Sequence, residues 1–255
     1  MHLVPLPALA DNYIWLLHDD DGNAVVVDPG SASPVEQALG VRKLRLRAIL
    51  LTHHHSDHIG GATALRDRYG VPVYAPEDER ISMATVRVRD GEHIRLSQPQ
   101  ASFATTAVPG HTLSHVAYHG HGVLLAGDTL FSMGCGRLFE GSPAQMLDSL
   151  DRLAALPLDT LLCCGHEYTA ANGQFASEVE PDNTALSARR RQVAALRDQG
   201  RPSLPVTLDS ELATNPFMRT DAPGVIAWCE RQAARPLNRI ERFATLRTAK
   251  DAFRA

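Results

Sequence analysis

Seven side chains that can bind metal ions follow apolar, strand-like segments of this 255-residue chain. Four of them lie together in the run Thr52-His53-His54-His55-Ser56-Asp57-His58. His53 and His55 are two residues apart, so in extended backbone they point the same way, and Asp57 and His58 follow in the turn into a helix. Imidazole and carboxylate groups are ligands for borderline metal ions such as zinc. The run therefore predicts a clip for one or two metal ions.

The other three candidate ligands are His111, Asp128 and His166, and each has a glycine directly before it. Glycine lets the backbone approach a site closely because it has no side chain. Seven ligands are too many for one tetrahedral ion, but they suit two ions that share a bridging carboxylate and a bridging hydroxide. A single histidine after a strand is more often a hydrogen-bonded surface residue. The dense run at 53–58 is what favours metal binding by His111 and His166.

Three nearby polar residues fit the metal site less well. Asp28 and His115 also lie near the ends of expected strands, and His115 is at best a residue that supports a ligand. His54 lies between two ligands and should point away from them. We therefore predict none of the three as a ligand.

The elements that position the ligands follow from the hydrophobic pattern. A short buried strand at 46–51 leads into the histidine run. Further strands are expected at 13–17, 24–28, 71–74, 85–88, 93–96, 102–108, 115–119, 123–126 and 160–164, and helices at 34–40, 59–69 and 143–155. After residue 166 the pattern changes to helices, expected at 168–179, 183–199, 222–233 and 236–253. We therefore predict an α+β chain with a mixed domain over 1–166 and a helical domain over 167–255.

Composition and charge restrict the class of protein. Hydrophobic residues make up 44% of the chain and charged residues 21%, which is ordinary for a soluble enzyme. No apolar stretch approaches the roughly 18 residues of a membrane span, and the first residues do not resemble a signal peptide. The four cysteines form neither a disulfide framework nor a metal clip, so a cytoplasmic location is expected. The net charge is −4 without a strongly basic stripe, which disfavours nucleic acid as a partner.

Basic residues gather near the end of the chain. Seven of them lie between 231 and 255, against only Glu241 and Asp251. For most of them a solvated helix face is the better interpretation. A few could instead steer or clamp an anionic substrate.

Four motifs resemble those of the metallo-β-lactamase superfamily: residues 52–58, Pro109-Gly110-His111-Thr112, Gly127-Asp128-Thr129 and Cys164-Gly165-His166. Other segments are similar to those of the glyoxalase II family, the hydroxyacylglutathione hydrolases: Ala10-Asp11-Asn12-Tyr13, residues 131–141, Cys164-Gly165-His166-Glu167-Tyr168-Thr169, Asn215-Pro216-Phe217-Met218-Arg219 and Arg247-Thr248-Ala249-Lys250-Asp251. The resemblance covers nearly the full chain. It implies a four-layer αβ/βα sandwich with a metal site at one edge, followed by a C-terminal α-helical domain.

The resemblance also implies the roles of individual residues. Two metal sites would share Asp128 as a bridging ligand, and Asp57 would orient the nucleophile. The remaining ligands divide between a first ion (His53, His55 and His111) and a second ion (Asp57, His58 and His166). Substrate contacts are implied for Arg137, Phe139, Tyr168, Arg247 and Lys250. Some family members have a tyrosine in place of Phe139, so one substrate hydrogen bond made elsewhere in the family has no counterpart here.

The implied reaction is hydrolysis of S-D-lactoylglutathione and related 2-hydroxyacyl-glutathione thioesters, the second step of methylglyoxal detoxification. Two cations lower the pKa of a bridging water from about 15.7 toward roughly 7, so hydroxide is present at neutral pH. The leaving thiol has a pKa of about 8.5, like free cysteine, and departs without a strong general acid. We expect a monomer that binds two divalent metal ions per chain, with zinc preferred over iron or manganese, and a small-molecule glutathione thioester.

Two rival functions remain open from the sequence. A glutathione persulfide dioxygenase of the same fold would need a single iron ion, and the basic pair at Arg247 and Lys250 disfavours it. A metal-binding protein without turnover is disfavoured by the complete set of seven ligands. A β-lactamase is less consistent still, because the segments that match glutathione-binding sequences would have no purpose in it.

Overall fold

The computed structural model describes residues 1–254, and the chain folds into two compact units. The first unit comprises residues 1–107, 114–127 and 163–166, and the second contains the remaining described residues. The chain therefore leaves and re-enters each unit along its length. Within residues 1–254, no helix combines the length and the hydrophobicity that a bilayer-spanning segment needs.

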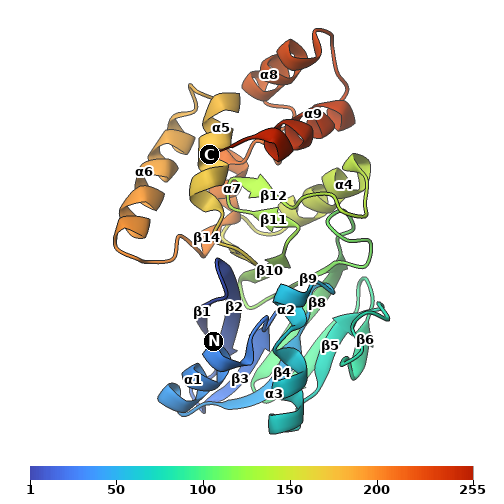
Figure 1. Cartoon of the computed structure of the whole chain (residues 1–255), viewed down its shortest axis with the longest axis vertical. Helices are drawn as coiled ribbons and strands as arrows, with labels where there is room; N and C mark the ends of the chain where they lie inside the picture. Colours follow the sequence, from blue (N-terminus) through green and yellow to red (C-terminus); the bar gives the residue numbers. More distant parts are fainter. Residues whose placement is uncertain (255) are drawn as a thin grey trace. The chain divides into compact units, whose positions relative to one another are not determined.

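A six-stranded sheet forms the base of the first unit (Figure 1). Its strands lie in sequence order: β1 (His2–Ala8), β2 (Asn12–His18), β3 (Asn23–Val27), β4 (Arg45–Leu50), β5 (Val73–Pro76) and β6 (Val86–Val88). The pairs β1–β2 and β2–β3 are antiparallel, whereas β3 to β6 are parallel. Val27 pairs with Leu50, so β3 and β4 end side by side. The residues that follow these two strands therefore meet at one edge of the sheet.

One face of this sheet is covered by α1 (Ala32–Arg42) and α3 (Ala62–Tyr69), as Figure 1 shows. Val35 of α1 and Leu65 of α3 are fully buried in a cluster with Ile14 and Ile49 of the sheet. The short helix α2 (Ser56–Ile59) lies between β4 and α3 in the chain. Burial of these aliphatic side chains fixes the end of β4, from which the histidine run leaves.

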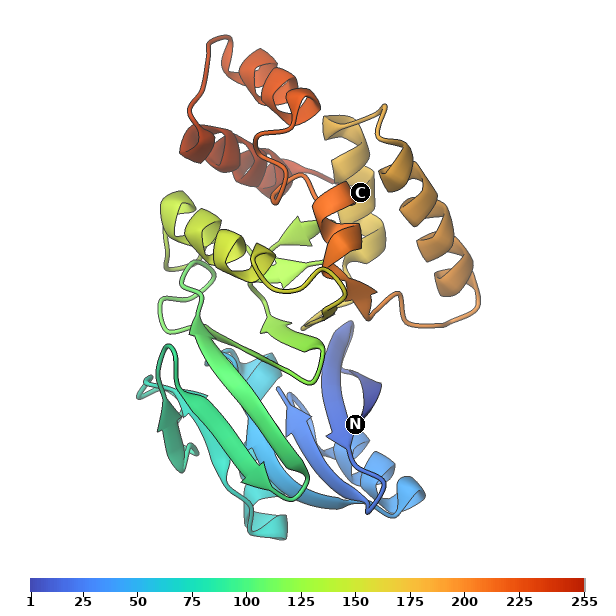
Figure 2. The ribbon, with the colours of Figure 1, turned by 180° about the vertical axis from the view of Figure 1, so that it is seen from behind.

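A second sheet lies over the other face of the first (Figure 2). Within the first unit its order is β13 (Leu161–Cys164), β10 (Val123–Gly127), β9 (Val116–Gly120), β8 (Gln100–Ala107) and β7 (His93–Ser97). The buried hydroxyl of Tyr118 donates a hydrogen bond to the Leu51 carbonyl at 2.7 Å, which joins the two sheets. The first unit is thus a helix–sheet–sheet stack.

The second unit is mainly helical: α4 (Pro143–Ala154), α5 (Thr169–Val179), α6 (Thr184–Asp198), α7 (Leu208–Thr214), α8 (Pro223–Ala233) and α9 (Arg239–Ala252). Side-chain caps explain several helix starts, since Ser142 and Gln145 form a reciprocal capping box at α4, and Asn238 and Glu241 form one at α9. The unit also contains a hairpin of β11 (Leu130–Phe131) and β12 (Gly134–Cys135), and β14 (Val206–Thr207), which pairs with the start of β13.

The expected elements are present, but five short or irregular ones were not predicted from the sequence. The prolines at 5 and 7 weaken the strand signal of β1 in the sequence. The strand tolerates them because it lies at the edge of its sheet. The hairpin strands β11 and β12 and the strand β14 have only two residues each, and α7 has seven. Elements this short carry no measurable periodicity.

Candidate metal centre

Asp28 fixes the start of the histidine run in the first unit. It directly follows β3, is 4% exposed and has a φ of +52°, a left-handed conformation that aspartate tolerates. Its carboxylate accepts hydrogen bonds from the Thr52 backbone N–H at 2.8 Å and from the Thr52 hydroxyl at 2.7 Å. The same carboxylate lies 3.0 Å from Nδ1 of His58. Asp28 therefore holds both the loop and the candidate ligand His58, which is a larger role than the sequence predicted.

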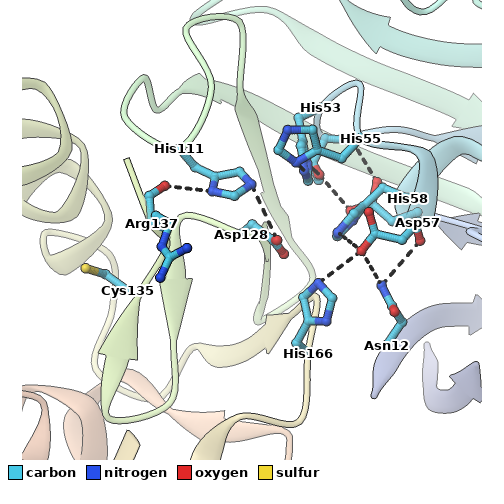
Figure 3. A network of polar contacts seen from close by, with 12 residues as sticks. Asn12, His53, His55, Asp57, His58, His111, Asp128, Cys135, Arg137 and His166 are labelled. Carbon is cyan, nitrogen blue, oxygen red and sulfur yellow. Dashed lines mark hydrogen bonds and ion pairs between the residues drawn. The ribbon is translucent and has the colours of Figure 1, made fainter. Parts of the chain in front are cut away.

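Asp57, His58 and His166 converge in the first unit, with ligand atoms within 4.8 Å of one another (Figure 3). Oδ2 of Asp57 lies 3.6 Å from Nε2 of His58 and 3.3 Å from Nε2 of His166. The Asn12 amide donates to the same Oδ2 at 3.0 Å, which holds the carboxylate in place. Nδ1 of His166 lies 2.7 Å from Oδ1 of Asp11. Both rings therefore turn Nε2 toward Asp57 and use Nδ1 for an acidic partner.

These distances fit ligands of a common ion better than direct hydrogen bonds. Two atoms bound at about 2.1 Å to one tetrahedral ion lie about 3.4 Å apart. The contacts of Asp57 with the two rings, at 3.6 and 3.3 Å, bracket that value. Metal-binding histidines also place a carboxylate on their other ring nitrogen, as Asp28 and Asp11 are placed here. The chemistry and spacing of this group fit a divalent metal ion.

His53 lies beside this group, with its ring centroid 4.2 Å from that of His58. Nε2 of His53 lies 3.1 Å from Nδ1 of His55, and the His53 ring stacks on His115 at a centroid distance of 4.6 Å. Asp28, His53 and His58 form a second group with ligand atoms within 4.8 Å, although the Asp28 carboxylate already serves Thr52 and His58. His54 faces Asp78 instead, with Nδ1 at 3.6 Å from its carboxylate.

His111 and Asp128 form a corresponding pair in the second unit (Figure 3). Nδ1 of His111 lies 2.9 Å from the Arg137 carbonyl and donates to it, and Nε2 lies 3.5 Å from Oδ2 of Asp128. Both residues are buried, at 4% and 6% exposure. Gly136 makes this arrangement possible, because a Cβ at that position would lie 1.9 Å from the Asp128 carbonyl oxygen. The spacing again matches two ligands of one ion.

The residues implied to contact substrate all lie in the second unit. Nε of Arg137 and Nη2 of Arg247 both contact Oδ1 of Asp251, at 3.1 and 3.0 Å. Arg247 is 7% exposed and also donates to the Cys135 carbonyl at 2.7 Å. Nζ of Lys250 lies over an aromatic ring, 5.4 Å from the Phe253 centroid. Burial, followed by the Arg247 charge, lowers the pKa of Lys250.

Phe139 and Tyr168 complete that implied set. Phe139 is 61% exposed, and its ring lies 5.2 Å from the His111 ring. Tyr168 is 37% exposed, and its ring lies 5.3 Å from that of Phe131. Both offer accessible aromatic surface in the second unit. Phe139 lies beside the candidate ligand His111, and Tyr168 follows the candidate ligand His166 by two residues in the sequence.

Three supporting residues of the site were not predicted from the sequence: Asp11, Asn12 and Asp28. Each lies at least 30 residues from the ligand that it contacts. Asp11 and Asn12 belong to a segment that resembles the glyoxalase II family, which was their only signal. Asp28 could have been found from the parallel pairing of β3 and β4, because that pairing places it beside Thr52.

Comparison with known proteins gives the family. Residues 10–166 match the metallo-β-lactamase superfamily, and residues 167–253 match the C-terminus of hydroxyacylglutathione hydrolases. The chain is 51% identical to the hydroxyacylglutathione hydrolase of Xanthomonas campestris over the full length of both proteins. The chain belongs to the hydroxyacylglutathione hydrolase family. The predicted family and α+β fold class are thereby confirmed.

Other members and folds agree with this assignment. A hydroxyacylglutathione hydrolase of Xylella fastidiosa is 51% identical over 99% of this chain and 98% of that protein. Among solved structures, ETHE1 from Myxococcus xanthus is 27% identical with a TM-score of 0.68, covering 98% of this chain and 91% of that one. TTHA1623, solved in a di-iron-bound form, is 26% identical with a TM-score of 0.60, covering 84% of this chain and 99% of that one.

Proposed function

We propose that this protein is a metal-dependent thioesterase that hydrolyses S-D-lactoylglutathione and related 2-hydroxyacyl-glutathione thioesters to glutathione and a hydroxy acid such as D-lactate. The 51% identity to a hydroxyacylglutathione hydrolase along the whole chain carries this proposal. The match of residues 167–253 to the C-terminus of the same family supports it further, because the superfamily match alone does not distinguish glutathione thioesters from other substrates.

Two divalent metal ions, preferably zinc, are proposed to share Asp128 as a ligand. The coordination of one ion would be completed by His53, His55 and His111. That of the other ion would be completed by Asp57, His58 and His166. The distances within each unit support this division, because Asp57, His58 and His166 have the spacing of common ligands, as do His111 and Asp128. The di-iron form of TTHA1623 is consistent with two ions in this fold.

Bound metal ions would supply hydroxide near neutral pH and an electrophile for the thioester carbonyl. The side chains around them hold the geometry. Asn12 holds the Asp57 carboxylate so that its Oδ2 faces Nε2 of His58 and Nε2 of His166, where it would orient the nucleophile. Asp11 and Asp28 accept a hydrogen bond from Nδ1–H of His166 and His58, respectively, so each ring turns the lone pair of Nε2 toward Asp57. The thiolate of glutathione needs no protonated side chain to leave.

The substrate contacts are proposed for Arg137, Phe139, Tyr168, Arg247 and Lys250. The two arginines and Lys250 place positive charge near Asp251 in the second unit, as an anionic tripeptide requires. A functional division at 166/167, with metal chemistry before it and substrate binding after it, is proposed on the same basis. The monomeric state and the cytoplasmic location stay predictions from the sequence.

Hydrolysis and metal content measured on one sample test the proposal. The purified chain, loaded with zinc, should consume S-D-lactoylglutathione with loss of thioester absorbance and should contain two ions per chain. An intact thioester would contradict the function, and one ion per chain would contradict the binuclear centre. Oxygen uptake with glutathione persulfide instead of thioester hydrolysis would indicate the rival dioxygenase.

A further inference from the structure

The hairpin of β11 and β12 links the two candidate ligands of the second unit. Asp128 lies two residues before β11, and Arg137 lies two residues after β12. The Gly136 N–H donates to the Thr129 carbonyl at 3.1 Å and closes the base of the hairpin. Since the Arg137 carbonyl orients His111, the hairpin base sets Asp128 directly and His111 indirectly. Strands of two residues cannot hold such a structure alone, because even a longer isolated hairpin is marginally stable in water.

Glu211 of α7 holds the tip of this hairpin. Its carboxylate is fully buried and accepts hydrogen bonds from the Ser132 hydroxyl and the Met133 N–H, both at 2.7 Å. Met133 has a φ of +56°, a conformation that costs about 1 kcal/mol and needs outside support. Burial raises the pKa of Glu211, and its hydrogen bonds from Ser132, Met133 and Asn215 oppose that rise. A buried carboxylate that serves two groups of one turn holds that turn in place.

Asn215, directly after α7, holds both strands of the hairpin. Its Nδ2 donates to the Phe131 carbonyl at 3.1 Å and to the Gly134 carbonyl at 2.9 Å. It also lies 3.0 Å from Glu211, and its Oδ1 accepts from the Phe217 N–H at 3.1 Å, which fixes the orientation of the amide. Each strand of the hairpin is thus attached to the same side chain.

We propose that Glu211 and Asn215 are positioning residues of the metal centre. They hold the β11–β12 hairpin so that Asp128 and His111 have their ligand geometry before any metal binds. The pair acts through the hairpin and touches neither metal nor substrate. This inference rests on the proposed function only in taking Asp128 and His111 as ligands. Small displacements of ligand-bearing backbone have large effects, since a shift of about 1 Å can cost a hundredfold in rate.

The test compares Asn215→Ala with Asn183→Ala in the full chain. Asn183 is a matched control because it also lies beside a helix of the second unit, where it accepts from Leu186 N–H and donates to the Ala213 carbonyl, each at 3.0 Å. Chelator competition should show zinc affinity about tenfold to hundredfold weaker in Asn215→Ala, and nearly unchanged in Asn183→Ala. In the metal-free chains, amide hydrogen exchange at 129–137 should speed up only in Asn215→Ala. For hydrolysis, kcat should fall more than KM rises.

Glu211→Gln provides rescue by a conservative change. The glutamine oxygen can accept from the Met133 N–H and the Asn215 amide, and its NH₂ can donate to the Ser132 hydroxyl, which is also an acceptor. Zinc affinity and hairpin exchange should therefore stay close to those of the unmodified chain. Equal zinc affinity and equal hairpin exchange in Asn215→Ala and Asn183→Ala would overturn the proposal. So would a loss in Glu211→Gln as large as in Asn215→Ala.

Failure of this inference is distinguishable from failure of the proposed function. Hydrogen exchange of the metal-free chain and zinc affinity need no substrate. A chain that leaves the thioester intact but shows these differences would retain the positioning pair and lose only the proposed reaction.

Discussion

Histidines of the two units are held by different groups. In the first unit, Nδ1 of His58 faces Asp28 at 3.0 Å and Nδ1 of His166 faces Asp11 at 2.7 Å. In the second unit, Nδ1 of His111 faces a backbone carbonyl, that of Arg137, at 2.9 Å. A carboxylate strengthens the imidazole as a ligand, whereas a carbonyl mainly orients it. The first unit therefore holds its candidate ligands His58 and His166 by charge, whereas the candidate ligands of the second unit depend on the position of one hairpin.

The backbones that carry these ligands differ in the same way. Residues 52–58 leave the end of β4, a strand buried in a six-stranded sheet. Asp128 and Arg137 flank two-residue strands, which are held by side chains on α7 and directly after it. Rigid sheet ends position ligands through the core, whereas the hairpin needs specific polar contacts. Four experiments test this contrast between the two units.

Removal of metal should have the largest effect. A chelator should lower kcat/KM at least about a thousandfold, because metal stabilisation of the transition state is worth several kcal/mol. In hydrogen exchange, residues 52–59 should become less protected than in the zinc form, whereas 129–137 should change little because Glu211 and Asn215 still hold them. Zinc addition should restore the activity. Equal loosening of both segments would contradict the contrast.

Asp28→Ala should have the next largest effect. It leaves the buried N–H and hydroxyl of Thr52 without their acceptor, so the free energy of unfolding should fall by about 3 kcal/mol. Loss of the His58 partner should weaken zinc binding about tenfold to hundredfold. Denaturant unfolding of the metal-free chain and chelator competition measure the two effects.

Asp19→Ala is the control for that experiment. Asp19 also accepts two hydrogen bonds, from the N–H and the amide of Asn23, at 2.7 and 2.9 Å, but in the turn between β2 and β3. The zinc affinity of the Asp19→Ala variant should equal that of the unmodified chain. A shared loss of zinc affinity would show that general destabilisation, rather than loss of the His58 partner, is the cause.

Asp11→Asn should weaken zinc binding less, by about tenfold. Asp11 lies 2.7 Å from His166, but its side chain is 41% exposed, so water screens part of its charge. Asp20→Asn is a matched control, because Asp20 contacts His2 at the same distance of 2.7 Å on an exposed surface. Isothermal titration with zinc should separate the two variants. If both bind zinc as tightly as the unmodified chain, the carboxylate on His166 has no influence on the metal.

Thiol labelling should give the smallest signal. Burial raises the pKa of Cys135 to about 11 and raises that of Cys163 well above its usual range. At pH 8 the thiolate is scarce in both, so iodoacetamide should label the folded chain very slowly and the unfolded chain fully. In Asn215→Ala the labelling of Cys135 should increase while that of Cys163 should not, because only Cys135 lies in the hairpin. Mass spectrometry of digests would measure the labelling of each cysteine. Equal increases in the labelling of Cys135 and Cys163 would indicate global unfolding.

The first unit was more predictable from the sequence than the second. Its candidate ligands His53, His55, Asp57 and His58 lie in one short run after an apolar strand, so the local pattern was enough to propose them. Hydrophobic periodicity also predicted the long helices of the second unit, because they bury one face each. The contacts of Asp28 follow from the pairing of β3 with β4, and the contact of Asp11 with His166 joins segments 155 positions apart. The pattern of a single strand encodes neither.

The contacts of Glu211 and Asn215 with the hairpin of the second unit could not be predicted from local sequence patterns. Glu211 contacts Met133 across 78 positions of sequence, and Asn215 contacts Phe131 across 84. A buried carboxylate on a seven-residue helix and a buried amide directly after it look in sequence like ordinary surface residues. The Asn215 segment was noticed only because it resembles the glyoxalase II family. Its physical role depends on contacts that no local pattern contains.

The interleaved course of the chain also constrains its synthesis. Residues 163–166 belong to the first unit, and they bring His166 to Asp57 and His58. At roughly 5–20 residues per second, a ribosome releases the histidine run seconds before it releases His166. A nascent chain that ends before residue 163 therefore exposes Asp57 and His58 without their third partner. A metal site that needs all three side chains would therefore be complete only after the later part of the chain is synthesised.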